Sequence, residues 1–300
     1  MGLFTRRKGQ LVNGDVDRII DLVSARFVSS GVAVEVAEGT AGIDTILLAA
    51  DGTQYPLYNI ITRALALPRD SAEYHEAIDG HVKGLVAAIG NPVHSSLSEA
   101  EFEAVVRVRL AHESIRQMLP LSYARPFAGD LIVALCLDTP TTVEYVSDET
   151  LEGRDVERLY QVGLANALAE PLLGVQEVAP GVVVLEGESF FTASKAVDFE
   201  QLLGSVLPAS PYGVVFGVPH RHLIVAHVLS GPESITAIGS VAQLTAMQAG
   251  EGAPGGPLSA HLYYWHDGDV EVAGGASAEG AIEIRPSERF MAVLNAIAAV

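Results

Sequence analysis

Cysteine is nearly absent from this sequence, and no apolar run approaches the length of a membrane-spanning helix. The single cysteine, Cys136, lies inside the apolar run of residues 131–137, so an internal disulfide is impossible and a buried thiol is expected. That run and those at 182–185 and 223–228 are about four to seven residues long, against roughly 20 for a bilayer-spanning helix. We therefore expect no membrane span.

The sequence also predicts no secretory signal. The basic cluster Arg6-Arg7-Lys8 is not followed by the apolar stretch that such a signal needs, because Asp15 and Asp17 interrupt it. Together with the lone cysteine, this predicts a cytoplasmic protein.

Positive charge is scarce. The formal net charge is −19, and it is uneven: residues 1–125 carry 12 basic and 15 acidic side chains, whereas residues 126–300 carry 6 and 22. A nucleic-acid binder needs clustered Lys and Arg to displace counterions, and the only cluster is Arg6-Arg7-Lys8. We expect no nucleic-acid partner, and an acidic C-terminal part that stays soluble by self-repulsion.

Familiar catalytic signatures are lacking as well. The sequence has no Gly-x-Ser-x-Gly nucleophile elbow and no Walker loop. Residues 250–255 formally match a dinucleotide-binding fingerprint, but they follow a predicted helix and contain Pro254, whereas the fingerprint must follow a strand and open a helix. A buried Cys136 would be a poor nucleophile. Whether the protein is an enzyme is uncertain, and these absences favour a non-enzymatic protein without a cofactor.

What the sequence does contain is the alternating pattern of an α+β protein. Apolar spacing and turn residues predict helices at 15–29, 56–65, 70–89, 155–173, 194–207, 232–249 and 286–300, and a helix beginning at Ser98 with Glu101 as its capping partner. Strands are predicted at 32–36, 43–49, 130–137, 182–185, 213–218, 222–229, 261–266 and 270–272, the last two joined by Asp267-Gly268. Strict strand-helix-strand alternation is missing, which favours mainly antiparallel sheets.

The same pattern predicts two domains. Residues 1–120 form an N-terminal α+β domain with a helical linker, and residues 121–300 an acidic C-terminal α+β domain. Residues 35–39 and 177–181 share the pattern Glu-Val-Ala-x-Gly, each after a predicted helix and before an apolar stretch. This suggests a duplicated helix-strand-strand-helix unit, with a chance match as the alternative.

The strongest candidate site is His220-Arg221-His222, between two apolar strands. In an extended segment His220 and His222 would point to one face, as two imidazoles sharing a metal ion do. A third ligand would have to come from elsewhere, and His261, His266, Asp267 and Asp269 qualify only by residue type. The alternatives are a ligand or partner surface formed with Arg221, and a turn whose polar side chains bond the backbone.

Trp265, the only tryptophan, is the second candidate. In a strand, Tyr263 and Trp265 share one face and Tyr264 takes the other. Two alternatives follow: these rings pack in the core, or Trp265 is an exposed aromatic anchor for a protein partner.

A family resemblance begins at Arg125. Arg125-Pro126 with residues 130–140, then residues 145–149, 164–168 and 213–226 make the chain similar to the YtpQ-like family of uncharacterised bacterial proteins. Family members often carry an acidic residue where this sequence has His222. The resemblance implies a cytoplasmic protein and offers no established catalytic residues to transfer.

The leading hypothesis is therefore a non-enzymatic protein- or peptide-binding adaptor, with His220, Arg221, His222 and Trp265 as candidate binding residues. The alternative is a metal-dependent hydrolase that uses His220 and His222. The sequence leaves the oligomeric state open.

Overall fold

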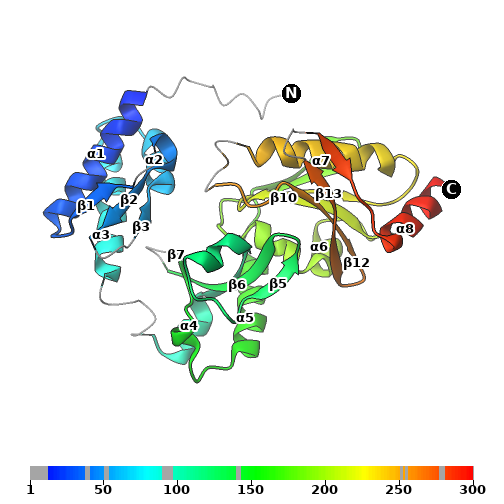
Figure 1. Cartoon of the computed structure of the whole chain (residues 1–300), viewed down its shortest axis with the longest axis horizontal. Coiled ribbons are helices and arrows are strands. Elements are labelled where there is room, and N and C mark those ends of the chain that lie inside the picture. Colours follow the sequence, from blue (N-terminus) through cyan, green and yellow to red (C-terminus); the bar gives the residue numbers. More distant parts are fainter. Residues whose placement is uncertain are drawn as a thin grey trace. The chain divides into compact units, whose positions relative to one another are not determined.

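The structure is a computed structural model that describes residues 13–37, 41–50, 54–89, 97–139, 143–250, 253, 256–276 and 281–299. The chain separates into two compact units, Met1–Ser96 with Pro140–Thr142, and Leu97–Thr139 with Val143–Val300. Both contain helices and antiparallel sheets, which confirms the α+β prediction (Figure 1). None of the helices in these ranges combines the length and apolar composition that crossing a bilayer requires.

The first unit packs three helices on a small antiparallel sheet. Its elements are α1 (Asn13–Ser29), β1 (Val34–Val36), β2 (Ile46–Ala49), β3 (Gln54–Pro56), α2 (Tyr58–Leu65) and α3 (Ala72–Ala88), and its strands pair in the order β1-β2-β3. The apolar face predicted for α1 is buried: Val16, Ile19, Ile20, Val23 and Phe27 are each at most 9% exposed. Burial of this stripe holds α1 against the sheet.

A seven-stranded antiparallel sheet organises the second unit. Its strands are β8 (Gly174–Ala179), β9 (Val182–Glu186), β10 (Val214–His220), β11 (Leu223–Val228), β12 (His261–His266), β13 (Asp269–Ala276) and β14 (Ile282–Ile284), in the order β14-β13-β12-β10-β11-β9-β8. The predicted hairpin through Asp267-Gly268 is confirmed, and both residues have positive φ (51° and 86°), as a tight hairpin turn requires.

The two faces of this sheet pack on different partners. One face is covered by α7 (Ser234–Gln248) and α8 (Glu288–Ala298), whose Phe290 ring stacks 4.3 Å from that of Tyr264. The other face carries Phe216 and Tyr263 and meets a smaller sheet, since the ring of Phe127 contacts both. The predicted alternation of residues 263–265 between faces is therefore confirmed.

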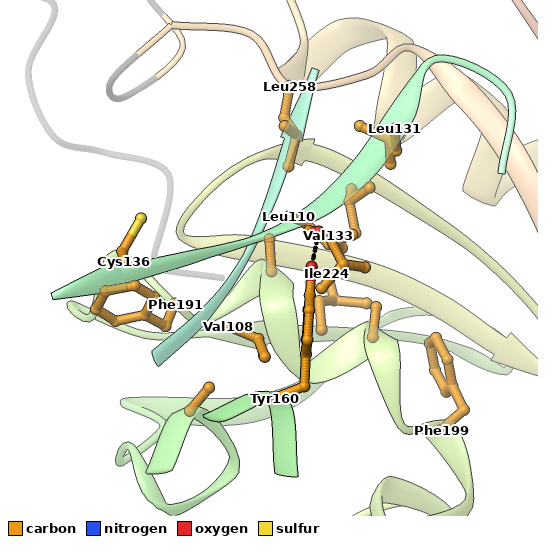
Figure 2. Close-up of a cluster of buried hydrophobic side chains, with 14 of the residues drawn as sticks. Val108, Leu110, Leu131, Val133, Cys136, Tyr160, Phe191, Phe199, Ile224 and Leu258 are labelled. Carbon is orange, nitrogen blue, oxygen red and sulfur yellow. Dashed lines mark hydrogen bonds between the residues drawn. The ribbon is translucent and has the colours of Figure 1, made fainter. Parts of the chain in front are cut away.

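The smaller sheet has β6 (Leu131–Asp138) at its centre. The strand β4 (Val106–His112) pairs along one side, and β5 (Arg125–Ala128) and β7 (Val143–Tyr145) pair in succession along the other. Helices α5 (Val156–Ala169), η5 (Ala193–Val197) and α6 (Phe199–Ser205) complete the core. Figure 2 shows Tyr160 of α5 reaching this sheet, where its hydroxyl donates to the Val133 carbonyl at 2.9 Å.

Buried Lys195 of η5 has a structural role. It is 3% exposed, and its Nζ donates to the carbonyls of Ala167 (3.1 Å) and Leu168 (2.6 Å) at the end of α5. Carbonyls in the last turn of a helix lack i+4 donors, and of these two only that of Ala167 accepts from a nearby backbone group, the Glu170 N–H at 3.4 Å. A cation also suits the negative end of the helix dipole.

The second unit begins earlier than the sequence-based division at 120/121. The helix α4 (Glu99–Val105) starts with the predicted capping box, in which Ser98 and Glu101 bond reciprocally. It leads directly into β4, which pairs along its whole length with β6. By these contacts, residues 97–120 belong with the part of the chain that follows them.

The two stretches of the suspected duplication share their order of elements. Helix α1 precedes the antiparallel pair β1-β2, and α5 precedes the pair β8-β9. The sheets differ, because β2 continues to β3 whereas β9 continues to β11. Residues 38 and 39 of the sequence match lie outside the described residues, and duplication stays a hypothesis. The cluster Arg6-Arg7-Lys8 and most of the fingerprint-like stretch at 250–255 also lie outside the described residues.

Candidate functional site

The candidate segment His220-Arg221-His222 forms the turn between β10 and β11. His220 ends β10 opposite Leu223, and Arg221 and His222 make the connection. His220 is 6% exposed, and the other two are half-buried. The two imidazole rings lie 6.3 Å apart at 55°. The extended conformation expected through His222 is thus replaced by a turn after His220.

Hydrogen bonds within the turn engage both imidazoles. The His222 backbone N–H donates to His220 Nδ1 at 3.3 Å, and Arg221 Nε–H donates to His222 Nε2 at 3.0 Å. Each bond uses the lone pair of one ring nitrogen, so in the neutral tautomers the protons sit on His220 Nε2 and His222 Nδ1. The lone pairs that a metal ion would need are already accepting hydrogen bonds.

The electrostatics of the turn keep both histidines neutral at pH 7. Burial lowers the pKa of His220 to about 4, and the charges of His222 and Arg221 act in the same direction. Burial also lowers the pKa of His222 to about 4, and the charge of Arg221 lowers it further. The carbonyls of Ser189 and Gly187 oppose this change.

The turn is anchored on the start of η5 and on the loop that precedes it. Backbone N–H groups of Gly187 and Ala193 donate to the carbonyls of His222 (3.2 Å) and Arg221 (2.9 Å). The Arg221 guanidinium stacks over the Phe190 ring at 4.1 Å. These contacts fix Arg221 in place, and they match the alternative in which polar residues of a turn bond the backbone.

Among the described residues, no third metal ligand lies near the turn. In the ranges that the structure covers, no three His, Cys, Asp or Glu side chains are arranged to hold a metal ion. Of the residues considered as further ligands, His266 contacts the Pro211 carbonyl (3.1 Å) and Asp269 pairs with Arg289 (2.9 Å).

Trp265 lies in the core rather than on the surface. It is 7% exposed, and its ring is 6.2 Å from that of Phe199. Its position on the face of β12 that packs on the smaller sheet explains this burial. The side chain thus offers no exposed aromatic surface to a partner.

A polar cluster that sequence reasoning missed surrounds Asp130. The hydroxyls of Ser259 (2.9 Å) and Tyr263 (2.7 Å) donate to its Oδ1, while the Nε2 atoms of His112 and His261 lie 3.6 and 3.7 Å from Oδ2. Burial and the Asp130 charge raise the pKa of Tyr263. The cluster ties the β5-β6 turn to the start of β12 across 129 residues of sequence, so no local motif could reveal it.

The open edge of the seven-stranded sheet is the other feature with functional potential. Strand β8 ends the strand order, and Leu173 and Val175 are 63% and 42% exposed. The Gly187 N–H bonds the His222 carbonyl on the β11 side, so the next residue along β9, Glu186, directs its backbone groups towards β8. Gly174 and Gln176, which pair with Glu186 and Val184, therefore point inward, and by alternation the backbone groups of Val175 and Glu177 point outward. We call Leu173–Glu177 with these outward groups the β8 edge.

Natural sheets protect such edges with Lys, Pro or a covering segment. Strand β8 contains neither Lys nor Pro, and its bulge begins only after Glu177. By contrast, on the edge strand β4 of the smaller sheet, the Leu110 N–H donates to Ser194 Oγ at 3.0 Å. The other edge strand of the seven-stranded sheet, β14, is only three residues long. The β8 edge is the longest exposed strand edge among the described residues of this sheet.

Acidic side chains lie on and beside the β8 edge. Glu177 and Glu186 are exposed on β8 and β9, and Glu188 is exposed just beyond. No Lys or Arg occurs from residue 159 to residue 194. The edge therefore presents apolar side chains and unpaired backbone groups in a negative field.

Fold and site together define an acidic α+β protein with an open sheet edge and a buried, hydrogen-bonded histidine turn. No family model, no curated protein and no solved structure matches the chain. The resemblance of residues 125–300 to the YtpQ-like family therefore stays a prediction.

Proposed function

We propose that this chain is a cytoplasmic, non-enzymatic protein that binds an extended peptide segment of a protein partner. The observation that carries the proposal is the β8 edge, where Val175 and Glu177 direct backbone donors and acceptors outward. Strand addition uses such groups for affinity and alternate side chains for specificity. The buried free thiol of Cys136 supports a reducing compartment.

The charge around the β8 edge selects the kind of segment. An added strand would lie beside Leu173 and Val175, which favour apolar side chains, and within reach of Glu177 and Glu186, which favour Lys or Arg. The fitting partner segment is therefore extended and alternates apolar with basic residues.

A fluorescent peptide of alternating Val and Lys tests the proposal by anisotropy. We expect saturable binding that is lost when alternate peptide amides are N-methylated, because methylation removes the donors that pair with β8. Val175→Lys should weaken binding about tenfold or more, since it places a charge on the edge and repels the basic peptide.

The matched control is Ile282→Lys. Ile282 is an exposed apolar residue (37%) on β14, the strand at the opposite end of the same sheet. Equal loss of binding in both variants would indicate non-specific attraction to an acidic protein and refute the proposal, as would undiminished binding of the N-methylated peptide.

A further inference from the structure

Arg109 occupies an unusual position on β4. It is half-buried opposite Ala134 of β6, and its guanidinium carbon lies 5.0 Å from the centre of the Tyr145 ring on β7. The buried Cys136 thiol is close enough that Arg109 opposes the burial that raises its pKa to about 11. Arg109 is thus surrounded by an aromatic ring and a thiol rather than by water alone.

Nine arginines elsewhere in this acidic chain have carboxylate partners. Ion pairs with Asp or Glu are formed by Arg18, Arg26, Arg69, Arg107, Arg125, Arg154, Arg158, Arg285 and Arg289. Within the described ranges, no carboxylate lies within ion-pair distance of Arg109. A partly buried cation without an anion is costly, and a cation–π contact offsets only part of that cost.

A second cation lies close to Arg109. The N–H of Leu110, the next residue, donates to Ser194 Oγ (3.0 Å), and the N–H of the adjacent Ala193 donates to the Arg221 carbonyl (2.9 Å). Two consecutive residues of η5 thus bridge β4 and the histidine turn. Burial raises the pKa of Tyr145 to about 12, and both Arg109 and Arg221 oppose this rise, in keeping with their proximity.

We propose that Arg109, Arg221 and the Tyr145 hydroxyl form a binding site for an oxyanion, either a carboxylate or a phosphate group. Guanidinium forks hold such groups through paired, charge-assisted hydrogen bonds. The Phe190 ring holds the Arg221 guanidinium in place, and the Tyr145 ring supports that of Arg109. The anion would supply Arg109 with the negative partner that nine other arginines find within the chain. This site is independent of the β8 edge.

The test is calorimetric titration of the purified full chain with inorganic phosphate and, separately, with acetate, at constant ionic strength maintained with chloride. We expect saturable binding of at least one of them, weakened about tenfold or more in Arg109→Gln. Phosphate binding without acetate binding would identify the phosphate group as the ligand chemistry, and the reverse would identify a carboxylate.

The matched control is Arg125→Gln. The Arg125 guanidinium also lies over a tyrosine ring, that of Tyr160 at 3.6 Å, but it pairs with Glu157. Its loss removes the same charge and the same kind of ring contact and should leave anion affinity unchanged. If Arg109→Gln does not fold, Arg109→Lys carries the test, because Lys keeps the charge but not the planar fork and should still weaken binding. Absence of saturable binding in the native chain, or equal weakening in the Arg109 and Arg125 variants, would overturn the proposal.

Discussion

Acidification should destabilise the second unit through His220. Its pKa is about 4 in the folded chain and about 6.5 when unfolded, so the unfolded chain binds the proton more readily. The stability from a neutral His220 is complete above about pH 6.5 and is lost as the pH falls through the folded-state pKa. At about 1.4 kcal/mol for each pKa unit, this costs about 3 kcal/mol by pH 4.

Urea unfolding between about pH 7 and pH 4, followed by the fluorescence of Trp265, measures this loss. Trp265 is the only tryptophan and lies in the core of the second unit, so its emission reports on that unit. The informative variant is His220→Asn, because an Asn side-chain oxygen can replace Nδ1 as acceptor for the His222 N–H. We expect it to lose about 3 kcal/mol less than the native chain over this range.

The control is His261→Gln, at a side chain that is 42% exposed. It should follow the native pH dependence more closely than His220→Asn does. If His220→Asn and the native chain lose the same unfolding free energy on acidification, the folded chain does not exclude a protonated His220, and the reasoning fails.

Three other outcomes are expected. Lys195→Met should lower the free energy of unfolding by about 1 to 3 kcal/mol, measured by urea titration, because it removes the ammonium donor to the Ala167 and Leu168 carbonyls at the end of α5; an unchanged midpoint would contradict that role. Cys136 should resist a thiol reagent in the native chain and react on unfolding, since burial raises its pKa to about 11; rapid native labelling, followed by absorbance, would show that the thiol is accessible. Elemental analysis should find no stoichiometric transition metal, because the lone pairs of His220 Nδ1 and His222 Nε2 already accept hydrogen bonds; metal that is lost in the His220→Ala, His222→Ala double mutant would overturn the non-enzymatic proposal.

Elements with a strong local signal could be predicted from the sequence. The buried stripe of α1, the capping box at Ser98 and the Asp267-Gly268 hairpin all depend on residues close together in the chain. Strand β4 was missed although Val106, Val108 and Leu110 alternate with arginines, because a capping box marks where a helix starts and not where it ends. Strand β8 was missed because an exposed edge strand buries no face and leaves no alternation.

The sites depended on contacts that sequence could not supply. The position of His220 and His222 beside a strand was predicted, but their tautomers follow from the turn geometry and from Arg221. The cluster around Asp130 and the approach of Arg109 to Arg221 join distant segments through sheet packing. Such convergence follows from tertiary structure alone.

The unequal ends of the large sheet limit how far strand addition can proceed. A sheet with two long open margins could recruit one chain after another into a fibre. Here β8 offers six residues whereas β14 offers three, so only one margin is long enough to add a full strand. If two copies paired through their β8 strands, each copy would lose its one long open edge, and assembly would stop at a dimer.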